Sequence, residues 1–133
     1  MTYQYKKTIN EFELDTMNLE IESFCERNEV PASKLFSIQL IIEELVSNII
    51  KYGQGESGKA TIEVEVHIDG EQIRLCISDN SAAFNPLEQE MANTKLSAEE
   101  RDIGGLGLFL VRKKVTSLSY EYNNGYNKLI ALI

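Results

Sequence analysis

Two stretches of alternating apolar and polar residues, joined by a tight turn signal, constrain the fold of this chain more than any other feature. They cover residues 61–68 and 72–78, and Asp69-Gly70 lies between them. Alternation with a period of two is typical of a strand that buries one face, and Asp-Gly is favoured in two-residue hairpin loops. The pattern predicts a β-hairpin with one apolar face, which needs a second layer to cover it.

Both ends of the chain show the same period. Residues 2–10 alternate, as do residues 117–122 and 126–133, which flank a second turn signal, Asn123-Asn124-Gly125. Each of these segments predicts a strand. Because strands joined by hairpins run antiparallel, we expect a mixed sheet in which most pairs are antiparallel.

Three further stretches predict helices. They cover about 15–28, with Asp15 or Thr16 as the cap, about 33–52, and about 105–115. The apolar side of the first helix is expected to consist of Leu19, Ile21, Phe24 and Cys25. With helices gathered on one face of a mostly antiparallel sheet, the expected fold class is α+β, a two-layer sandwich.

The size and charge of the chain restrict its class. A length of 133 residues corresponds to about one domain, and no linker or repeat divides it, so residues 1–133 are expected to form one unit. The net charge of −8 argues against nucleic acid or an anionic membrane as a partner. No apolar run approaches the ~20 residues that cross a bilayer, and the N-terminus lacks an apolar signal core. We therefore expect a cytoplasmic protein, in which Cys25 and Cys76 are free thiols rather than a disulfide.

Two segments show no regular period. Residues 53–58 contain three glycines and predict a loop. Residues 85–103 are rich in polar side chains, and a segment of that length in a compact domain is usually a functional lid or disordered. We expect a lid at about 85–103.

The second predicted helix carries polar side chains on an otherwise apolar surface. Glu44 and Asn48 are four residues apart and therefore share one face. A carboxylate and a carboxamide among apolar residues cost stability unless they are satisfied or open into a site. The spacing alone leaves two readings open, a narrow solvent-facing stripe and a functional pair.

Asp79 follows the predicted strand 72–78. A carboxylate in this place can accept a hydrogen bond from an amino group in a pocket. It can equally cap a turn through its own backbone, as Asp often does after a strand.

The sharpest feature is the cluster Gly104-Gly105-Leu106-Gly107 directly before the third predicted helix. Glycines let backbone amides approach an anion closely, and the N-terminus of a helix favours negative charge. A dinucleotide-binding motif would need G-x-G-x-x-G after a strand, which is not present. The cluster indicates either an anion site or tight packing of a helix start.

These three features, in this order, resemble the motifs of the Bergerat-fold ATPases, which include gyrase-type topoisomerases, heat-shock chaperones, histidine kinases and anti-sigma factor serine kinases. Glu44 and Asn48 match the E-x-x-x-N motif, Asp79 the Asp-led glycine box, and Gly105-Leu106-Gly107 the G-x-G box. The small size and the run from Gly104 to Lys113 are similar to the stand-alone anti-sigma factor serine-protein kinases. The resemblance covers about residues 15–133 and implies the Bergerat ATP-binding fold.

The resemblance implies a role for each matching residue. Glu44 would act as the general base, Asn48 would bind Mg²⁺, and Asp79 would accept a hydrogen bond from the adenine amino group of ATP. The other ATP-binding residues would be Phe84, Gly104, Gly105, Leu106 and Gly107. The lid residues Lys95 and Arg101 could touch the phosphates.

The chain departs from the family pattern in two places. Ser81 and Ala83 stand in the stretch where the glycine box usually has glycine or proline, and Tyr52 stands where many members carry His. Ser81 has a side chain where the family usually has none, so it affects how closely the backbone can approach adenine.

The resemblance implies a kinase that phosphorylates a serine on a small antagonist protein and sequesters a sigma factor or another regulator. A non-catalytic ATP-binding module that acts by sequestration alone is the alternative. A third reading is an ATP-binding subunit whose activity comes from a partner chain. The alternating N-terminal strand could also pair with a second copy, so a homodimer is possible.

Overall fold

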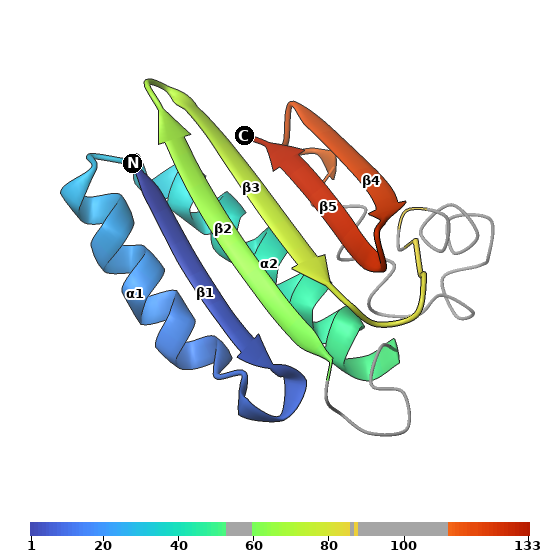
Figure 1. Ribbon diagram of the computed structural model, residues 1–133. Coiled ribbons are helices and arrows are strands. Elements are labelled where there is room, and N and C mark those ends of the chain that lie inside the picture. Colours follow the sequence, from blue (N-terminus) through green and yellow to red (C-terminus); the bar gives the residue numbers. More distant parts are fainter. Residues whose placement is uncertain (53–59, 86, 88–111) are drawn as a thin grey trace, which may run out of the picture.

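The described part of the chain forms two layers, a β-sheet and two helices that cover one of its faces (Figure 1). The computed structural model describes residues 1–52, 60–85, 87 and 112–133. Its elements, in chain order, are β1 (Thr2–Thr8), the 3-10 turn η1 (Ile9–Glu11), α1 (Leu14–Arg27), α2 (Ala32–Tyr52), β2 (Thr61–Asp69), β3 (Gln72–Asp79), β4 (Ser117–Asn123) and β5 (Tyr126–Leu132). The predicted α+β class is confirmed.

The five described strands lie in the order β1-β2-β3-β5-β4. All four pairings between them are antiparallel, where the sequence predicted a mixed, mostly antiparallel sheet. β5 lies between β3 and β4, so the C-terminal hairpin joins the sheet beside the end of β3. This order brings the last residues of β3 next to the first residues of β5, which matters for the site described below.

Both predicted hairpins are present. In the β2–β3 hairpin, Gly70 has a φ of 63°, and in the β4–β5 hairpin Asn124 and Gly125 have φ of 54° and 82°. Two successive positive φ values define a type I′ turn, which matches the right-handed twist of the flanking strands and favours Asn-Gly.

The core lies between the sheet and the helices, and each strand contributes every second residue to it. On β2, Ile62, Val64 and Val66 are fully buried, while Glu63 and Glu65 line the open face of the sheet. α2 contributes a long apolar stripe to the same cluster, made of Ile38, Ile41, Ile42, Leu45 and Val46. The strict alternation explains why the sheet is covered on one face and polar on the other.

The start of α1 differs from the prediction. The helix begins at Leu14 with Glu13 as N-cap, and no side chain caps it. Thr16 lies inside the first turn, where its Oγ1 donates a hydrogen bond to Glu13 Oε2 at 2.8 Å. The expected cap at Asp15 or Thr16 is therefore wrong, because both residues are already helical.

The buried face of α1 also differs from the prediction at one residue. Leu19 is 65% exposed, whereas Met17 is fully buried. Met17, Ile21 and Phe24 are spaced at i, i+4 and i+7 and share a stripe, while Leu19 is two residues from both Met17 and Ile21 and points away from the sheet. Ile21, Phe24 and Cys25 are buried as expected.

Truncation of these two residues should separate their roles. We expect Met17→Ala to lower the free energy of unfolding by about 2–5 kcal/mol, because it leaves a cavity in the core. Leu19→Ala should change it by less than about 0.5 kcal/mol. Urea unfolding followed by circular dichroism measures both, and equal losses would contradict the burial pattern.

Three predicted segments lie wholly or largely outside the residues that the structure describes. They are the loop at 53–58, most of the helix at 105–115 and most of the lid at 85–103.

The two cysteines are described and are free, as expected. Burial raises the pKa of the Cys25 thiol and that of the Cys76 thiol.

Candidate functional site

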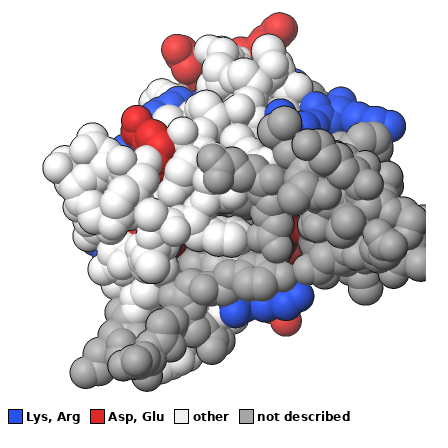
Figure 2. Space-filling model, turned by 90° about the vertical axis from the view of Figure 1, so that its right-hand side faces the viewer, with Lys and Arg blue, Asp and Glu red and all other residues white. Residues whose placement is uncertain are grey.

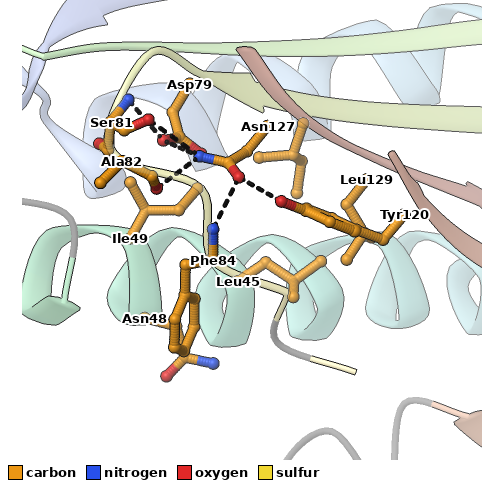
Figure 3. Close-up of a pocket in the computed structure, with 11 residues that line it drawn as sticks. Leu45, Asn48, Ile49, Asp79, Ser81, Ala82, Phe84, Tyr120, Asn127 and Leu129 are labelled. Carbon is orange, nitrogen blue, oxygen red and sulfur yellow. Dashed lines mark hydrogen bonds between the residues drawn. The ribbon is translucent and has the colours of Figure 1, made fainter. Parts of the chain in front are cut away.

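A small cavity lies between the C-terminal half of α2 and the neighbouring ends of β3, β4 and β5 (Figure 3). Its volume is about 40 Å³. The lining residues are Leu45, Asn48, Ile49, Ile77, Asp79, Ser81, Ala82, Phe84, Tyr120, Asn127 and Leu129. The cavity therefore combines an apolar wall from the helix with polar groups from the sheet.

The sheet register places two buried polar residues side by side in this wall. Asp79 is the last residue of β3 and pairs directly with Asn127 of β5. Both stand at positions where the alternation of their strands points toward the helices, beside Ile77 and Leu129. Asp79 is 4% and Asn127 6% exposed. Buried polar side chains need partners, so their hydrogen bonds show how the site is built.

The amide nitrogen of Asn127 contacts three acceptors. Nδ2 donates to Asp79 Oδ1 at 3.1 Å, to the carbonyl oxygen of Ala82 at 3.1 Å and to that of Ser81 at 3.3 Å. Figure 3 shows these contacts converging on one nitrogen. They connect β5 with the segment that follows β3.

The amide oxygen of Asn127 receives two donors from the opposite side. The backbone N–H of Phe84 donates to Oδ1 at 3.0 Å, and the Tyr120 hydroxyl donates to the same atom (Figure 3). Because a backbone N–H can only donate, the oxygen of the amide must face Phe84. The orientation of the Asn127 side chain is thus fixed by its partners.

Asp79 uses one carboxylate oxygen toward the protein. Oδ1 accepts from the backbone N–H of Ser81 at 3.0 Å and from Asn127 Nδ2. Among the described residues, none binds Oδ2. The turn-capping reading of Asp79 is therefore correct for Oδ1, while Oδ2 remains available as an acceptor at the cavity wall.

Ser81, the departure from the glycine box, adds a second unsatisfied group. Its side chain is 9% exposed, and its Oγ is buried without a hydrogen-bond partner in the described part of the chain. A buried hydroxyl without a partner costs about 1–3 kcal/mol. A polar ligand or an ordered water beside Asp79 would remove this cost.

The two polar residues predicted on α2 have different positions. Asn48 lines the cavity together with Leu45 and Ile49. Glu44 is half-buried one helical turn before Asn48 and is not part of the cavity wall. The shared helix face is confirmed, while the roles assigned to both residues remain predictions.

The predicted phosphate-binding residues belong to a part of the chain that the structure does not describe. Gly104, Gly105, Leu106 and Gly107 lie outside the described residues, as do Lys95 and Arg101. Asp79 and Phe84, by contrast, both line the cavity, as the sequence prediction requires.

Three cavity residues of the C-terminal hairpin were missed by the sequence prediction, namely Tyr120, Asn127 and Leu129. Asn127 carried a detectable signal. It shares the inward period of β5 with Leu129 and Ala131, so it is a polar residue at a position where the alternation predicts an apolar one.

The described residues on one side of the molecule carry few charged groups. On the side of the molecule shown in Figure 2, the described surface is mostly uncharged, with separate small groups of acidic and basic side chains. Within the described ranges, no helix is both long and apolar enough to cross a membrane.

Comparison with known sequences yields one family and several relatives. The family described as the histidine kinase-like ATPase domain matches residues 10–133. The chain is 28% identical over 109 residues to the serine/threonine-protein kinase BtrW of Bordetella bronchiseptica. This match covers 82% of this chain and 77% of that protein. It is 28% identical over 92 residues to the serine-protein kinase RsbW of Listeria innocua and 30% identical over 94 residues to that of Listeria monocytogenes serotype 4a. These two matches span 66% of this chain and 59% of each Listeria protein.

A solved structure with a similar fold comes from the SiaB-SiaC complex of Pseudomonas aeruginosa. The similarity covers 98% of this chain and 89% of that one, with a TM-score of 0.67 and a sequence identity of 12%. At this identity the similarity concerns the fold alone.

Proposed function

Because the chain belongs to the histidine kinase-like ATPase domain family, we propose that it is a protein kinase that binds ATP with Mg²⁺ and phosphorylates a serine on a small antagonist protein. The observation that carries the proposal is the buried Asp79, which keeps one carboxylate oxygen unused by the described residues at the wall of a cavity. ATP use follows from the family. The metal, the protein substrate and the partner are our proposals.

Base recognition is assigned to the β3 end of the cavity. Asp79 Oδ2 accepts from the exocyclic amino group of adenine, and the unpartnered Ser81 hydroxyl lies in the same wall. A hydrogen bond to a charged acceptor in a buried site contributes about 1.5–3 kcal/mol. Leu45, Ile49 and Leu129 supply the apolar surface that a flat base needs.

The cavity must widen when the base enters. A volume of about 40 Å³ holds a few water molecules, but not a purine. Phe84 is only half-buried and contacts Asn127 through its backbone, so its ring can turn aside at lower cost than the buried aliphatic side chains of the wall. The Phe84 ring would then cover the bound base.

Asn48 is suited to hold the metal. Its carboxamide offers an oxygen at the cavity wall, and Mg²⁺ takes oxygen ligands from one or two side chains, waters and substrate phosphates. Bound Mg²⁺ would offset the phosphate charge. The backbone amides of Gly105 and Gly107 are the proposed phosphate donors, with Gly104 and Leu106 completing the segment.

Glu44 is assigned the role of general base. Its carboxylate takes the proton from the serine hydroxyl of the antagonist protein, the serine oxygen bonds to the γ-phosphorus, and the bond to the β-phosphate oxygen breaks to release ADP. Its position one turn before Asn48 places it outside the base cavity but on the same helix face. This separation suits a residue that acts at the phosphate end of a nucleotide.

An exposed groove between α1 and α2 supports a protein partner. It has a volume of about 470 Å³ and includes Leu19 and Phe36, which are 65% and 57% exposed. Asp15, Glu22 and Glu43 form its acidic rim. The groove therefore fits a segment of the antagonist or regulator that combines apolar and basic side chains.

Two details of this groove agree with a basic partner. Lys114 Nζ lies 5.4 Å from the centroid of the Phe36 ring, so this ring already attracts a cation. The buried Oδ1 of Asn18, in the same groove, has no hydrogen-bond partner within the described residues.

A change in the groove should impair partner binding alone. We expect Leu19→Asp to weaken binding of the antagonist or regulator by at least about tenfold, since it places a charge in the apolar contact. ATP affinity should stay within about twofold, because the groove is separate from the cavity. Calorimetry measures both affinities, and Glu26→Asp on the exposed surface of the same helix is the control. Unchanged partner binding would exclude the groove as the contact.

The test of the function as a whole has two steps. Calorimetry with ATP and Mg²⁺ asks whether the nucleotide binds, and a radiolabel transfer assay against candidate antagonist proteins asks whether phosphate moves. No binding at millimolar ATP would refute the proposal. Binding without transfer, with the regulator still captured, would favour the alternative of a non-catalytic module.

A further inference from the structure

We propose that Asn127 is the positioning residue for base recognition, which commits one oxygen of Asp79 to the protein and presents the other to the 6-amino group of a purine. The inference rests on the proposed ATP site and concerns how that site selects its base. Asn127 does not need to touch the nucleotide. It acts through the carboxylate that does.

The first step of the argument is the number of groups that hold Asp79. The side-chain torsion of a carboxylate is broad and nearly two-fold, so its two oxygens exchange places easily when few contacts hold them. Here Oδ1 has two donors, the Ser81 N–H at 3.0 Å and Asn127 Nδ2 at 3.1 Å. Two donors on one oxygen fix the plane of the carboxylate and the direction of Oδ2.

The second step is the orientation of Asn127 itself. An amide that flipped by 180° would turn its oxygen toward Asp79 Oδ1 and set two acceptors against each other. The Phe84 N–H and the Tyr120 hydroxyl prevent this flip, because both donate to Oδ1 of Asn127. Tyr120 on β4 thus holds Asn127 on β5, which holds Asp79 on β3.

The third step is the chemistry of the ligand. A fixed Oδ2 accepts from a 6-amino group and repels the 6-oxo group of guanine or hypoxanthine, which is also an acceptor. A purine with only hydrogen at this position loses the hydrogen bond without repulsion. The class selected is therefore the 6-aminopurine nucleotides, and the selectivity depends on the orientation that Asn127 imposes.

Affinities for two nucleotides test this inference. ATP and purine riboside triphosphate, which lacks only the 6-amino group, are titrated into the wild type and into Asn127→Asp. We expect the wild type to prefer ATP by about 10–100-fold. In Asn127→Asp the preference should fall below about threefold, because a carboxylate at position 127 cannot donate to Asp79 Oδ1. A purely structural role would weaken both nucleotides equally and preserve the preference, which would overturn the inference.

Two further variants keep the test decisive. Asn123→Asp introduces the same change at an exposed position of β4 and should keep the wild-type preference. Loss of the preference in this control would also overturn the inference.

Tyr120→Phe removes only the hydroxyl that fixes the amide, and we expect the preference for ATP to fall about 3–10-fold. An unchanged preference would count against the inference even if Asn127→Asp does not fold. A wild type that binds neither nucleotide refutes the proposed function, whereas a preference retained in Asn127→Asp refutes this inference alone.

Discussion

Glu44→Gln is expected to abolish phosphoryl transfer while ATP affinity stays within about twofold. The loss of a general base typically costs ~10²–10⁴-fold in rate, and glutamine keeps the shape of glutamate and most of its hydrogen bonds. The nucleotide affinity should survive because Glu44 is not part of the cavity that takes the base. The radiolabel transfer assay gives the rate, and calorimetry gives the affinity.

A matched control is available on α1. Glu26 is exposed and lies outside both the cavity and the groove, so Glu26→Gln makes the identical chemical change away from the proposed phosphate end. It should leave the transfer rate unchanged. If Glu44 were only a solvated helix residue, both variants would transfer phosphate at the wild-type rate, and stability would change by no more than about 0.5 kcal/mol.

The sequence predicted both hairpins of the sheet because the evidence for a hairpin is local in the sequence. Strict alternation on β2 and β3, with Asp69-Gly70 between them, left one register for that hairpin, and Asn124-Gly125 did the same for the next. A shift by one residue would turn the whole apolar face toward solvent, so the hydrophobic pattern determines the pairing. The order of the strands, with β5 between β3 and β4, has no such local signal.

The cavity residues were predicted only in part, because sequence patterns reveal residues that lie close together along the chain. A motif predicted Asp79 and Phe84, which both line the cavity, but Asn127 lies 48 residues from Asp79 and becomes its neighbour only through the β3–β5 pairing. The error at Leu19 came from helix phase: an apolar residue was assigned to the core, although Met17 and Ile21 define the buried stripe. Position along a helix decides burial more reliably than hydrophobicity alone.

Asp79→Asn is expected to weaken ATP binding by about 10–150-fold, which corresponds to about 1.5–3 kcal/mol. The Asn127 and Ser81 donors hold the oxygen of the new amide at the Oδ1 position, so its NH₂ group takes the place of Oδ2. The adenine amino group would then meet a donor instead of an acceptor. Calorimetry with ATP and Mg²⁺ measures the effect.

The same substitution makes a second, more specific prediction, since the damage should be confined to the 6-amino contact. Purine riboside triphosphate, which lacks that group, should bind Asp79→Asn and the wild type with affinities within about threefold of each other. Asp69→Asn, at the exposed end of β2, is the control for loss of one negative charge and should bind ATP normally. If Asp79→Asn weakened both nucleotides alike, the carboxylate would act on the cavity as a whole and not on the amino group, and the assignment of Oδ2 to adenine would be wrong.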